Sequence, residues 1–251
     1  MSMMKWTAYV LLSMALLVAC EPPGDKKAKA AKKEKVSDGV IQSHFKSGKL
    51  RAEIVVKNGK KEGLAVEYYE NGNKFQEVNY KEGLQEGIAK KYFETGQLAQ
   101  ETLYKKGKRH GVQRKYRPNG KLVSEAEYFE DEPCIGLKEY LTDGSLKKKY
   151  PSIVIKPVDN ILIDGTYVLH LSLSERAKEV EFFVGQLSGG KYIGKDVKTV
   201  WTDKFGKAEL PFVVLPGQFI MEKVNIIARW KTTQGNYYIA QRTTNVAIEN
   251  R

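Results

Sequence analysis

Cysteine and histidine are scarce in this sequence, and no apolar run reaches the ~20 residues that a membrane-spanning helix needs. Only Cys20, Cys134 and the histidines His44, His110 and His170 occur among 251 residues. A disulfide framework needs several cysteines and a zinc site needs closely spaced ligands, so both are excluded. The sequence also lacks a nucleophile elbow and a phosphate-binding glycine loop. We therefore expect no metal, no bound cofactor and no enzymatic activity.

The charge balance is basic but evenly spread. The chain has 42 Lys and Arg against 30 Asp and Glu, a formal net charge of +12. The excess is divided among the N-terminal segment, the middle and the C-terminal hundred residues. A nucleic-acid-binding protein typically gathers its basic residues on one face or stripe. We therefore expect no nucleic-acid partner.

The N-terminus carries an export signal in residues 1–19. Lys5 precedes an apolar run from Trp6 to Ala19, which has the length of a signal-peptide core. The run ends in Leu17-Val18-Ala19-Cys20, which resembles the lipobox of bacterial lipoproteins. That resemblance implies cleavage between Ala19 and Cys20 and covalent lipid on Cys20. The alternative is an ordinary secretory signal that ends near a cysteine.

A lipidated Cys20 predicts an exported protein anchored to the bacterial cell envelope. Two or more acyl chains give stable membrane attachment without a transmembrane helix. Residues 20–36 follow, rich in lysine and without apolar periodicity, so we expect a disordered tether. Its lysines either stay solvated or lie on anionic head groups.

Residues 37–150 repeat with a period of 24. The clearest markers are glycines, which fall in three series, and tyrosines, which fall in two. The glycine series are Gly39, Gly63, Gly87 and Gly111; Gly48, Gly72, Gly96, Gly120 and Gly144; and Gly59, Gly83 and Gly107, with Asp131 in the next place. The tyrosine series are Tyr68, Tyr92, Tyr116 and Tyr140, and Tyr80, Tyr104 and Tyr128. A fixed period of this length indicates stacked structural repeats.

Each repeat is predicted to be a β-hairpin. Turn pairs such as Asn71-Gly72 are flanked by short runs that alternate between apolar and polar residues. One hairpin is marginal alone, so the units must stack into an elongated all-β sheet. The repeated Glu53, Glu77, Glu101 and Glu125 then form a row, which we expect to pair with neighbouring Lys and Arg.

The repeat resembles the MORN-repeat variant of bacterial lipoproteins and of proteins described as antitoxins. The shared pattern is G-x(4)-Y-(Y/F)-x-N-G-x-L-x-x-E-x-x-Y-x-x-G. The resemblance implies a non-enzymatic binding or scaffolding module with a protein or lipid partner. The alternative function is an antitoxin or immunity protein that neutralises a toxin by direct contact. Most such pairs act in the cytoplasm, whereas this chain carries an export signal.

Residues 151–251 are predicted to form an immunoglobulin-like (Ig-like) β-sandwich. Seven short strand-like runs are separated by turn signals such as Asp164-Gly165 and Pro216-Gly217. The stretch from Thr202 to Leu210 resembles a pattern of bacterial Ig-like domains, which act as spacers or adhesion modules. Trp201 and Trp230 are expected in the core.

The candidate binding patch lies in residues 105–121, which contain eight Lys and Arg and no acid. Its members are Lys105, Lys106, Lys108, Arg109, Arg114, Lys115, Tyr116, Arg117 and Lys121. A patch of this kind fits an acidic protein, an anionic lipid or an anionic envelope polymer. The alternative is a solvated basic edge that prevents aggregation. Cys134 is expected to be a small, partly buried turn residue, or else a thiol that pairs two molecules.

Overall fold

The computed structural model describes residues 38–251, so the expected signal peptide 1–19, including Ala19, and the whole tether 20–36, including Cys20, lie outside the described residues. The described residues belong to one compact unit, Val36–Arg251. They form strands almost throughout, with a single helical turn, α1 (Ile161–Asp164). Within this part of the chain no helix is long and apolar enough to cross a membrane. The predicted all-β class is confirmed.

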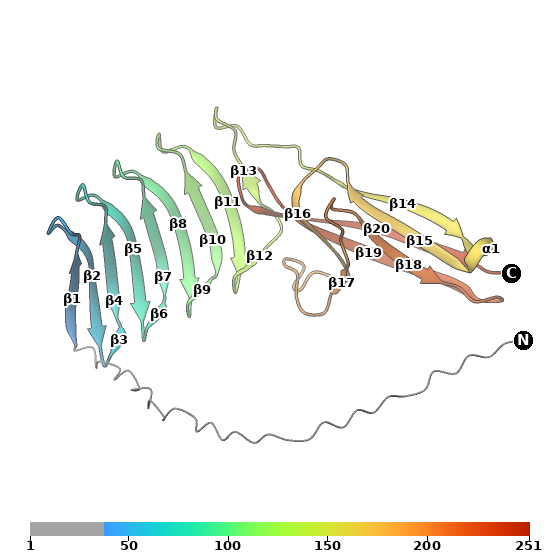
Figure 1. The fold of residues 1–251 in the computed structure, drawn as a ribbon, viewed down its shortest axis with the longest axis horizontal. Helices are drawn as coiled ribbons and strands as arrows, with labels where there is room; N and C mark the ends of the chain where they lie inside the picture. The colour runs from blue at the N-terminus through green and yellow to red at the C-terminus, as the bar shows by residue number, and fades with distance from the viewer. Residues whose placement is uncertain (1–37) are drawn as a thin grey trace, which may run out of the picture. The chain divides into compact units, whose positions relative to one another are not determined.

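The repeats form one antiparallel sheet of successive hairpins (Figure 1). Its long strands are β1 (Gly39–His44), β2 (Leu50–Lys57), β4 (Gly63–Tyr68), β5 (Lys74–Lys81), β7 (Gly87–Tyr92), β8 (Leu98–Lys105), β10 (Gly111–Tyr116) and β11 (Leu122–Phe129). Short strands follow each second arm: β3 (Lys60–Lys61), β6 (Leu84–Gln85), β9 (Lys108–Arg109), β12 (Glu132–Pro133) and β13 (Lys138–Glu139). Each long strand pairs with its neighbours in chain order, so the sheet is a meander.

The two turns of each repeat have different geometries. At the predicted turn of the second repeat, Gly72 has φ +94° and donates its N–H to the carbonyl of Tyr69 at 2.9 Å. The Asn71 side chain accepts the N–H of Asn73 at 2.9 Å, which fixes the turn locally. The connecting turn at Glu82-Gly83 has positive φ at both residues, as in a type I′ hairpin. These backbone requirements account for the glycine period.

Asp131 replaces glycine in the last connecting turn and still takes φ +75°. Its carboxylate accepts the backbone N–H and the Nε–H of Arg109, each at 3.0 Å. Arg109 in turn lies 4.0 Å above the ring of Tyr128. Aspartate takes the left-handed region more readily than most residues with a side chain, and these contacts hold Asp131 there in the place of a glycine.

The C-terminal hundred residues form a two-sheet sandwich. One sheet has the order β14 (Ile153–Asn160), β15 (Thr166–Leu173) and β18 (Ala208–Val213). The other has the order β17 (Lys198–Val200), β16 (Lys178–Val184), β19 (Phe219–Lys231) and β20 (Tyr237–Glu249). Leu169 and Leu171 of the first sheet share a buried core with Phe182, Ile226 and Trp230 of the second. Trp230 is 1% exposed, as expected.

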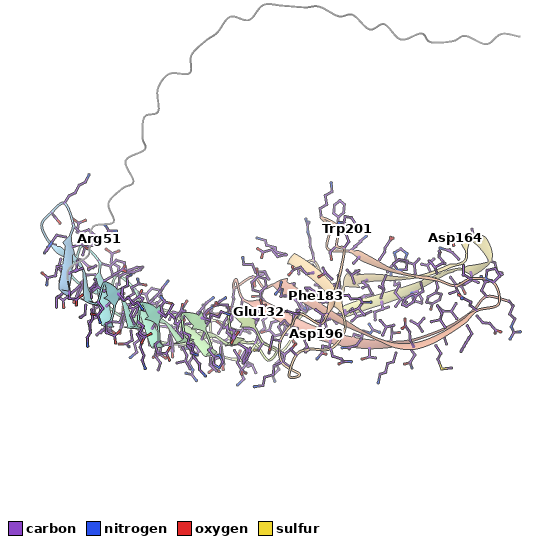
Figure 2. The ribbon with its side chains drawn as sticks, turned by 90° about the horizontal axis from the view of Figure 1, so that it is seen from below. Arg51, Glu132, Asp164, Phe183, Asp196 and Trp201 are labelled. Carbon is purple, nitrogen blue, oxygen red and sulfur yellow. The ribbon has the colours of Figure 1, made fainter. Side chains whose placement is uncertain are left out.

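The expectation for Trp201 is wrong, because its side chain is 79% exposed. Figure 2 shows it projecting away from the sandwich. Strand β17 ends at Val200, which is buried, and successive residues of an extended chain point to opposite sides. Burial of Val200 therefore turns its neighbour Trp201 outward.

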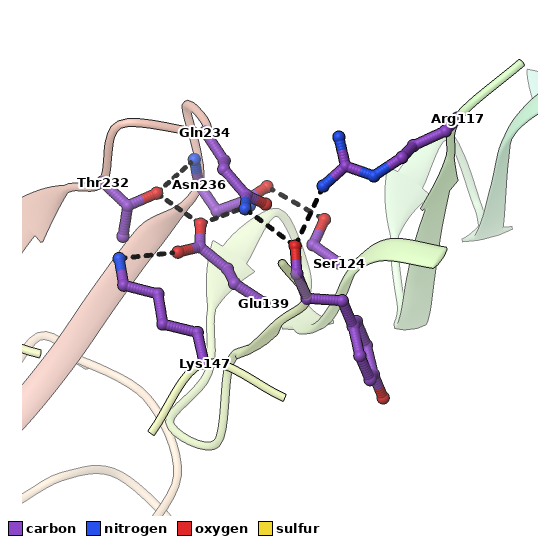
Figure 3. A network of polar contacts seen from close by, with 8 residues as sticks. Arg117, Ser124, Glu139, Lys147, Thr232, Gln234 and Asn236 are labelled. Atoms are coloured by element: carbon purple, nitrogen blue, oxygen red, sulfur yellow. Dashed lines mark hydrogen bonds and ion pairs between the residues drawn. The ribbon is translucent and has the colours of Figure 1, made fainter. Parts of the chain in front are cut away.

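A buried polar network joins the last repeat to the sandwich (Figure 3). Glu139 of β13 is 0% exposed and accepts hydrogen bonds from Thr232 Oγ1 at 2.5 Å and Asn236 Nδ2 at 2.8 Å. Lys147 Nζ lies 3.3 Å from the same carboxylate. Thr232 and Asn236 belong to the turn between β19 and β20, so this turn is seated on the repeat sheet. A buried charge is tolerated only when it is paired and hydrogen-bonded, and Glu139 is both.

Apolar contacts and a backbone bond support the same junction. Tyr238 of β20 packs against Ala126 and Tyr128 of β11. Cys134 is 3% exposed, and the next residue donates its N–H to the carbonyl of Lys191 at 2.8 Å. Burial raises the pKa of the Cys134 thiol. Cys134 is therefore a packed residue at the junction.

Candidate binding surface

The strand register divides the side chains of the repeat sheet into two faces. We call the face that carries Glu53, Glu77, Glu101 and Glu125 the ladder face, and the opposite one the inner face. Cross-strand partners share a face, so the register pairs Glu77 with Lys90, and Glu101 with both Lys90 and Arg114, on the ladder face. The inner face carries Val78, Thr102 and Ala126, which are all buried.

The predicted glutamate row alternates with basic residues from Glu77 onward, and we call it the charge ladder. Across the sheet the order is Gln42, Glu53, Val66, Glu77, Lys90, Glu101, Arg114, Glu125 and Lys138. Arg114 Nε lies 3.1 Å from Glu125, and Lys138 lies 3.9 Å from it on the other side. The basic members recur every 24 residues, as the glutamates do. Glu77 also pairs with Lys74, whereas Glu53 accepts the Gln42 amide and Glu101 the Tyr116 hydroxyl, so the expected pairing with Lys and Arg holds for two of the four glutamates.

Tyrosines of the same face lock the glutamates in place. The hydroxyls of Tyr92, Tyr116 and Tyr140 donate to Glu77, Glu101 and Glu125 at 2.6, 3.0 and 2.9 Å. The bond from Lys74 and that from Tyr92 lower the pKa of Glu77, and the bond from Tyr140 is the main cause that lowers the pKa of Glu125. Partial burial and the Glu77 bond raise the pKa of Tyr92 to about 12. The aromatic series has a polar role that the sequence did not indicate.

An apolar row runs beside the ladder on the same face. Each hairpin contributes one aliphatic residue from its first arm: Val40, Leu64, Ile88 and Val112. The cross-strand partner is apolar in two hairpins, Val55 and Leu103, and polar in the other two, Asn79 and Glu127. The exposed fractions of Val40, Leu64 and Ile88 are 59%, 46% and 52%. Exposed apolar residues scattered singly are ordinary, but a row repeated across four hairpins marks an interaction surface.

Sequence reasoning missed this row, although a signal was present. Val40, Leu64, Ile88 and Val112 are spaced 24 apart, in the same phase as the glycines. Periodicity alone assigns such residues to a core. The register places them on the ladder face, which, within residues 38–251, Lys191 and Tyr192 contact only at the last hairpin, through Glu127 and Phe129.

The structure distributes the residues of the basic segment 105–121 over both faces. Arg114 and Tyr116 belong to the ladder, where they contact Glu125 and Glu101. Lys115 points to the inner face and donates to Asn236 Oδ1 at 2.9 Å, within the junction. Burial lowers the pKa of Lys115. These three residues are structural members of the sheet.

The remaining basic residues lie at the ends of the hairpins. Lys108 is 3.4 Å from Glu130, Arg109 pairs with Asp131, and Arg117 donates to the carbonyl of Tyr140 at 3.0 Å. Lys121 donates to the carbonyl of Asp143 at 3.3 Å. Among the described residues, the side chains of Lys105 and Lys106 make no such contact. The segment is therefore not one continuous basic surface.

Titratable side chains of the described residues form no metal-binding cluster. No group of three His, Cys, Asp or Glu in residues 38–251 is placed to hold a metal ion. His170 Nδ1 lies 3.4 Å from Glu209, and both side chains are exposed. What the ladder face offers is a rigid pattern of apolar and charged groups, which suits binding.

Comparison with known families supports a binding role for the repeats. Residues 61–82, 85–106 and 109–130 match the MORN repeat variant, and together they cover about a quarter of the chain. Each matched segment contains the first arm, the turn and the second arm of one hairpin. The family is generally non-enzymatic, and its repeats indicate a binding module. No curated protein matches the chain. The middle of the protein therefore consists of MORN-variant repeats, three in succession.

Proposed function

We propose that this protein is a lipid-anchored lipoprotein of the bacterial cell envelope that binds a partner protein through the ladder face of its repeats. The observation that carries the proposal is the exposed apolar row beside the charge ladder. Exposed aliphatic groups favour burial against a partner, and an alternating row of charges fixes the register of what binds. Lys105 and Lys108 extend the same face at its edge.

The repeat geometry suits an elongated partner. Each hairpin offers one exposed aliphatic residue on its first arm and one glutamate on its second arm, so successive repeats add similar contacts. The junction around Glu139 fixes the last repeat to the sandwich, which serves as a support. Export and lipidation rest on the lipobox at Leu17 to Cys20 and on the basic, apolar N-terminus.

The sandwich is proposed to be an Ig-like spacer. Its first, second and fifth strands share one sheet, and its third, sixth and seventh share the other, with the fourth beside the third. Immunoglobulin sandwiches use this division, and the variable type also places an extra strand beside the third.

Partner binding is tested by cross-linking the anchored protein in membranes and recovering it. Replacing Leu64, Ile88 and Val112 by serine should reduce the recovered partner about tenfold, because contacts at the centre of an interface dominate affinity. The control replaces Leu162, Ile163 and Met221, which are apolar residues of the sandwich and are even more exposed to solvent. Equal recovery from wild type and the repeat variant would reject the ladder face.

The identity of the recovered partner separates the alternatives. A structural envelope protein supports scaffolding, whereas a single toxic protein favours the antitoxin or immunity function. Recovery of an anionic polymer or lipid alone would contradict a protein partner.

The anchor is tested independently. Cys20→Ser should release the protein from the membrane fraction, because the acyl chains are lost. Unchanged membrane retention of this variant would exclude the lipid anchor.

A further inference from the structure

A second surface, a cleft at one end of the sandwich, combines unpaired cations with exposed aromatic area. The cleft has a volume of about 860 Å³. It is lined by the linker 147–151, the turn 175–179, residues 204–205 and the turn 230–235. These segments are distant in sequence, so only the sandwich brings them together. We call this surface the sandwich cleft.

The charges of the sandwich cleft are only partly neutralised. Lys147 is paired with Glu139, and Lys231 Nζ lies 3.0 Å from Glu179. Arg176, Lys178 and Lys204 also line it, and none has a carboxylate within ion-pair distance in residues 38–251. The basic side chains that line the sandwich cleft therefore outnumber the acidic ones.

One acid of the lining, Glu175, is likewise unpaired. Three free cations against one free carboxylate leave the hollow positively charged. Because the hollow is walled by protein, its field is focused more strongly than that of the same charges on a flat surface.

Aromatic side chains form part of the wall. Phe205 is 69% exposed, and Lys204 Nζ lies 5.1 Å from its ring centre. The ring of Tyr150 is stacked on that of Tyr238, with centroids 4.0 Å apart, above the buried Trp230. An aromatic ring left in solvent beside a cation offers an apolar surface and a charge within one side-chain length.

We propose that the sandwich cleft binds an anionic polymer that carries carboxylate or phosphate groups. The Arg176 guanidinium binds an acidic group with two parallel N–H donors, and Lys178 and Lys204 act as point charges on neighbouring groups. Phe205 packs against the apolar part of the polymer backbone. This site lies on the sandwich, whereas the ladder face belongs to the repeats.

The test is titration of the full-length protein in detergent micelles at 0.1 M salt with four probes. Polygalacturonate supplies carboxylates, polyphosphate supplies phosphates, vesicles of phosphatidylglycerol supply lipid phosphate, and neutral dextran is the uncharged control. If the protein binds polygalacturonate or polyphosphate but does not bind neutral dextran, the result supports the proposal and identifies the acidic group. Binding of vesicles alone, or of none of the probes, overturns it.

Charge-matched variants locate the site. Replacing Arg176, Lys178 and Lys204 by serine should weaken the affinity about tenfold, since directed charge contacts are lost. The control replaces Lys156, Lys198 and Lys223 by serine, which removes the same charge from exposed positions of the sandwich outside the cleft and should leave the affinity within about twofold. Equal losses in the two triple variants would show non-specific attraction to a basic protein and reject the cleft.

Phe205→Ser tests the aromatic contact without changing the charge. It should weaken binding severalfold while the thermal unfolding midpoint stays unchanged, because the ring is exposed in the free protein. Wild-type affinity in this variant would overturn the assignment of Phe205 as a polymer contact.

Discussion

In the sandwich, two sheets close over Trp230, Phe182 and Ile226, whereas the repeat sheet leaves the apolar row of its ladder face in solvent. The sandwich is stabilised mainly by apolar burial. The repeats are held by antiparallel pairing, by turns that glycine permits, and by ion pairs and tyrosine hydrogen bonds to the glutamates of the ladder. The comparison teaches that a sheet can be specified by turn and ladder chemistry with little core, and that such a sheet keeps a face free for binding.

Core truncation should have the largest effect and should separate the two regions. Trp230→Ala should lower the free energy of unfolding by about 4 kcal/mol, because a fully buried aromatic side chain leaves a cavity. Val78→Ala on the inner face should lower the free energy of unfolding by only about 1.5 kcal/mol. Two methyl groups are removed, and the single sheet packs fewer side chains around them than the sandwich core does. Urea denaturation followed by circular dichroism measures both, and similar losses would contradict the contrast.

Removal of the junction carboxylate should have the next largest effect. Glu139→Ala should lower the free energy of unfolding by about 3 kcal/mol, because Lys147, Thr232 and Asn236 lose a buried partner. Glu139→Gln keeps the shape and part of the hydrogen bonding, so it should cost less. Hydrogen exchange should show faster opening at β13 and at the 232–236 turn, and an unchanged exchange pattern would argue against the network as the joint.

Substitutions in a connecting turn should change the stability less than loss of the junction carboxylate. Two adjacent residues of the same turn, Glu82 and Gly83, should respond differently. Gly83→Ala should cost about 1 kcal/mol, because φ at Gly83 is +85° and an added Cβ disfavours it. Glu82→Gly, at φ +51° in the same turn, should not destabilise the protein. Thermal unfolding of the two variants gives the comparison, and a loss in Glu82→Gly alone would refute the turn assignment.

The charge ladder should give the smallest effect, visible as a pH dependence. The pKa of Glu77 and that of Glu125 are lowered in the folded state, so their contribution is complete above the unfolded value of about 4.3. It is lost as the pH falls through the lowered folded values. Carboxyl NMR titration checks this, with Tyr140→Phe expected to raise the pKa of Glu125 and leave that of Glu77 unchanged. The contribution of the sandwich core to stability should not change over the same pH range, because the core is apolar.

Much of the repeat region could be predicted because its signals are local. The turn at Asn71-Gly72, the alternation on either side and the place of Asp131 in the glycine series all depend on neighbouring residues. Phasing the copies also predicted the glutamate row, and the expected pairing with Lys and Arg is found at Glu77 and Glu125 but not at Glu53 and Glu101. The seven strands of the sandwich were expected for the same reason, since each is bounded by its own turn signals.

The fate of individual side chains was harder to predict. Trp201 was expected in the core, and only the burial of Val200 at the end of β17 shows that it must point outward. The basic segment was expected to act together, but alternation along β10 sends Arg114 to the ladder face and Lys115 to the junction. Composition counts charges without regard to face, and register decides which face each one occupies.

The sequence by itself determined the 24-residue period, the two turns of each repeat and the all-β class, because these follow from backbone conformations that nearby residues impose. The tertiary structure alone decided which surfaces meet. Glu139 and Asn236, separated by 97 positions, form a buried hydrogen bond, and four segments distant in sequence line the sandwich cleft. Contacts of this kind depend on how the last repeat packs against the β19–β20 turn, which no local pattern encodes.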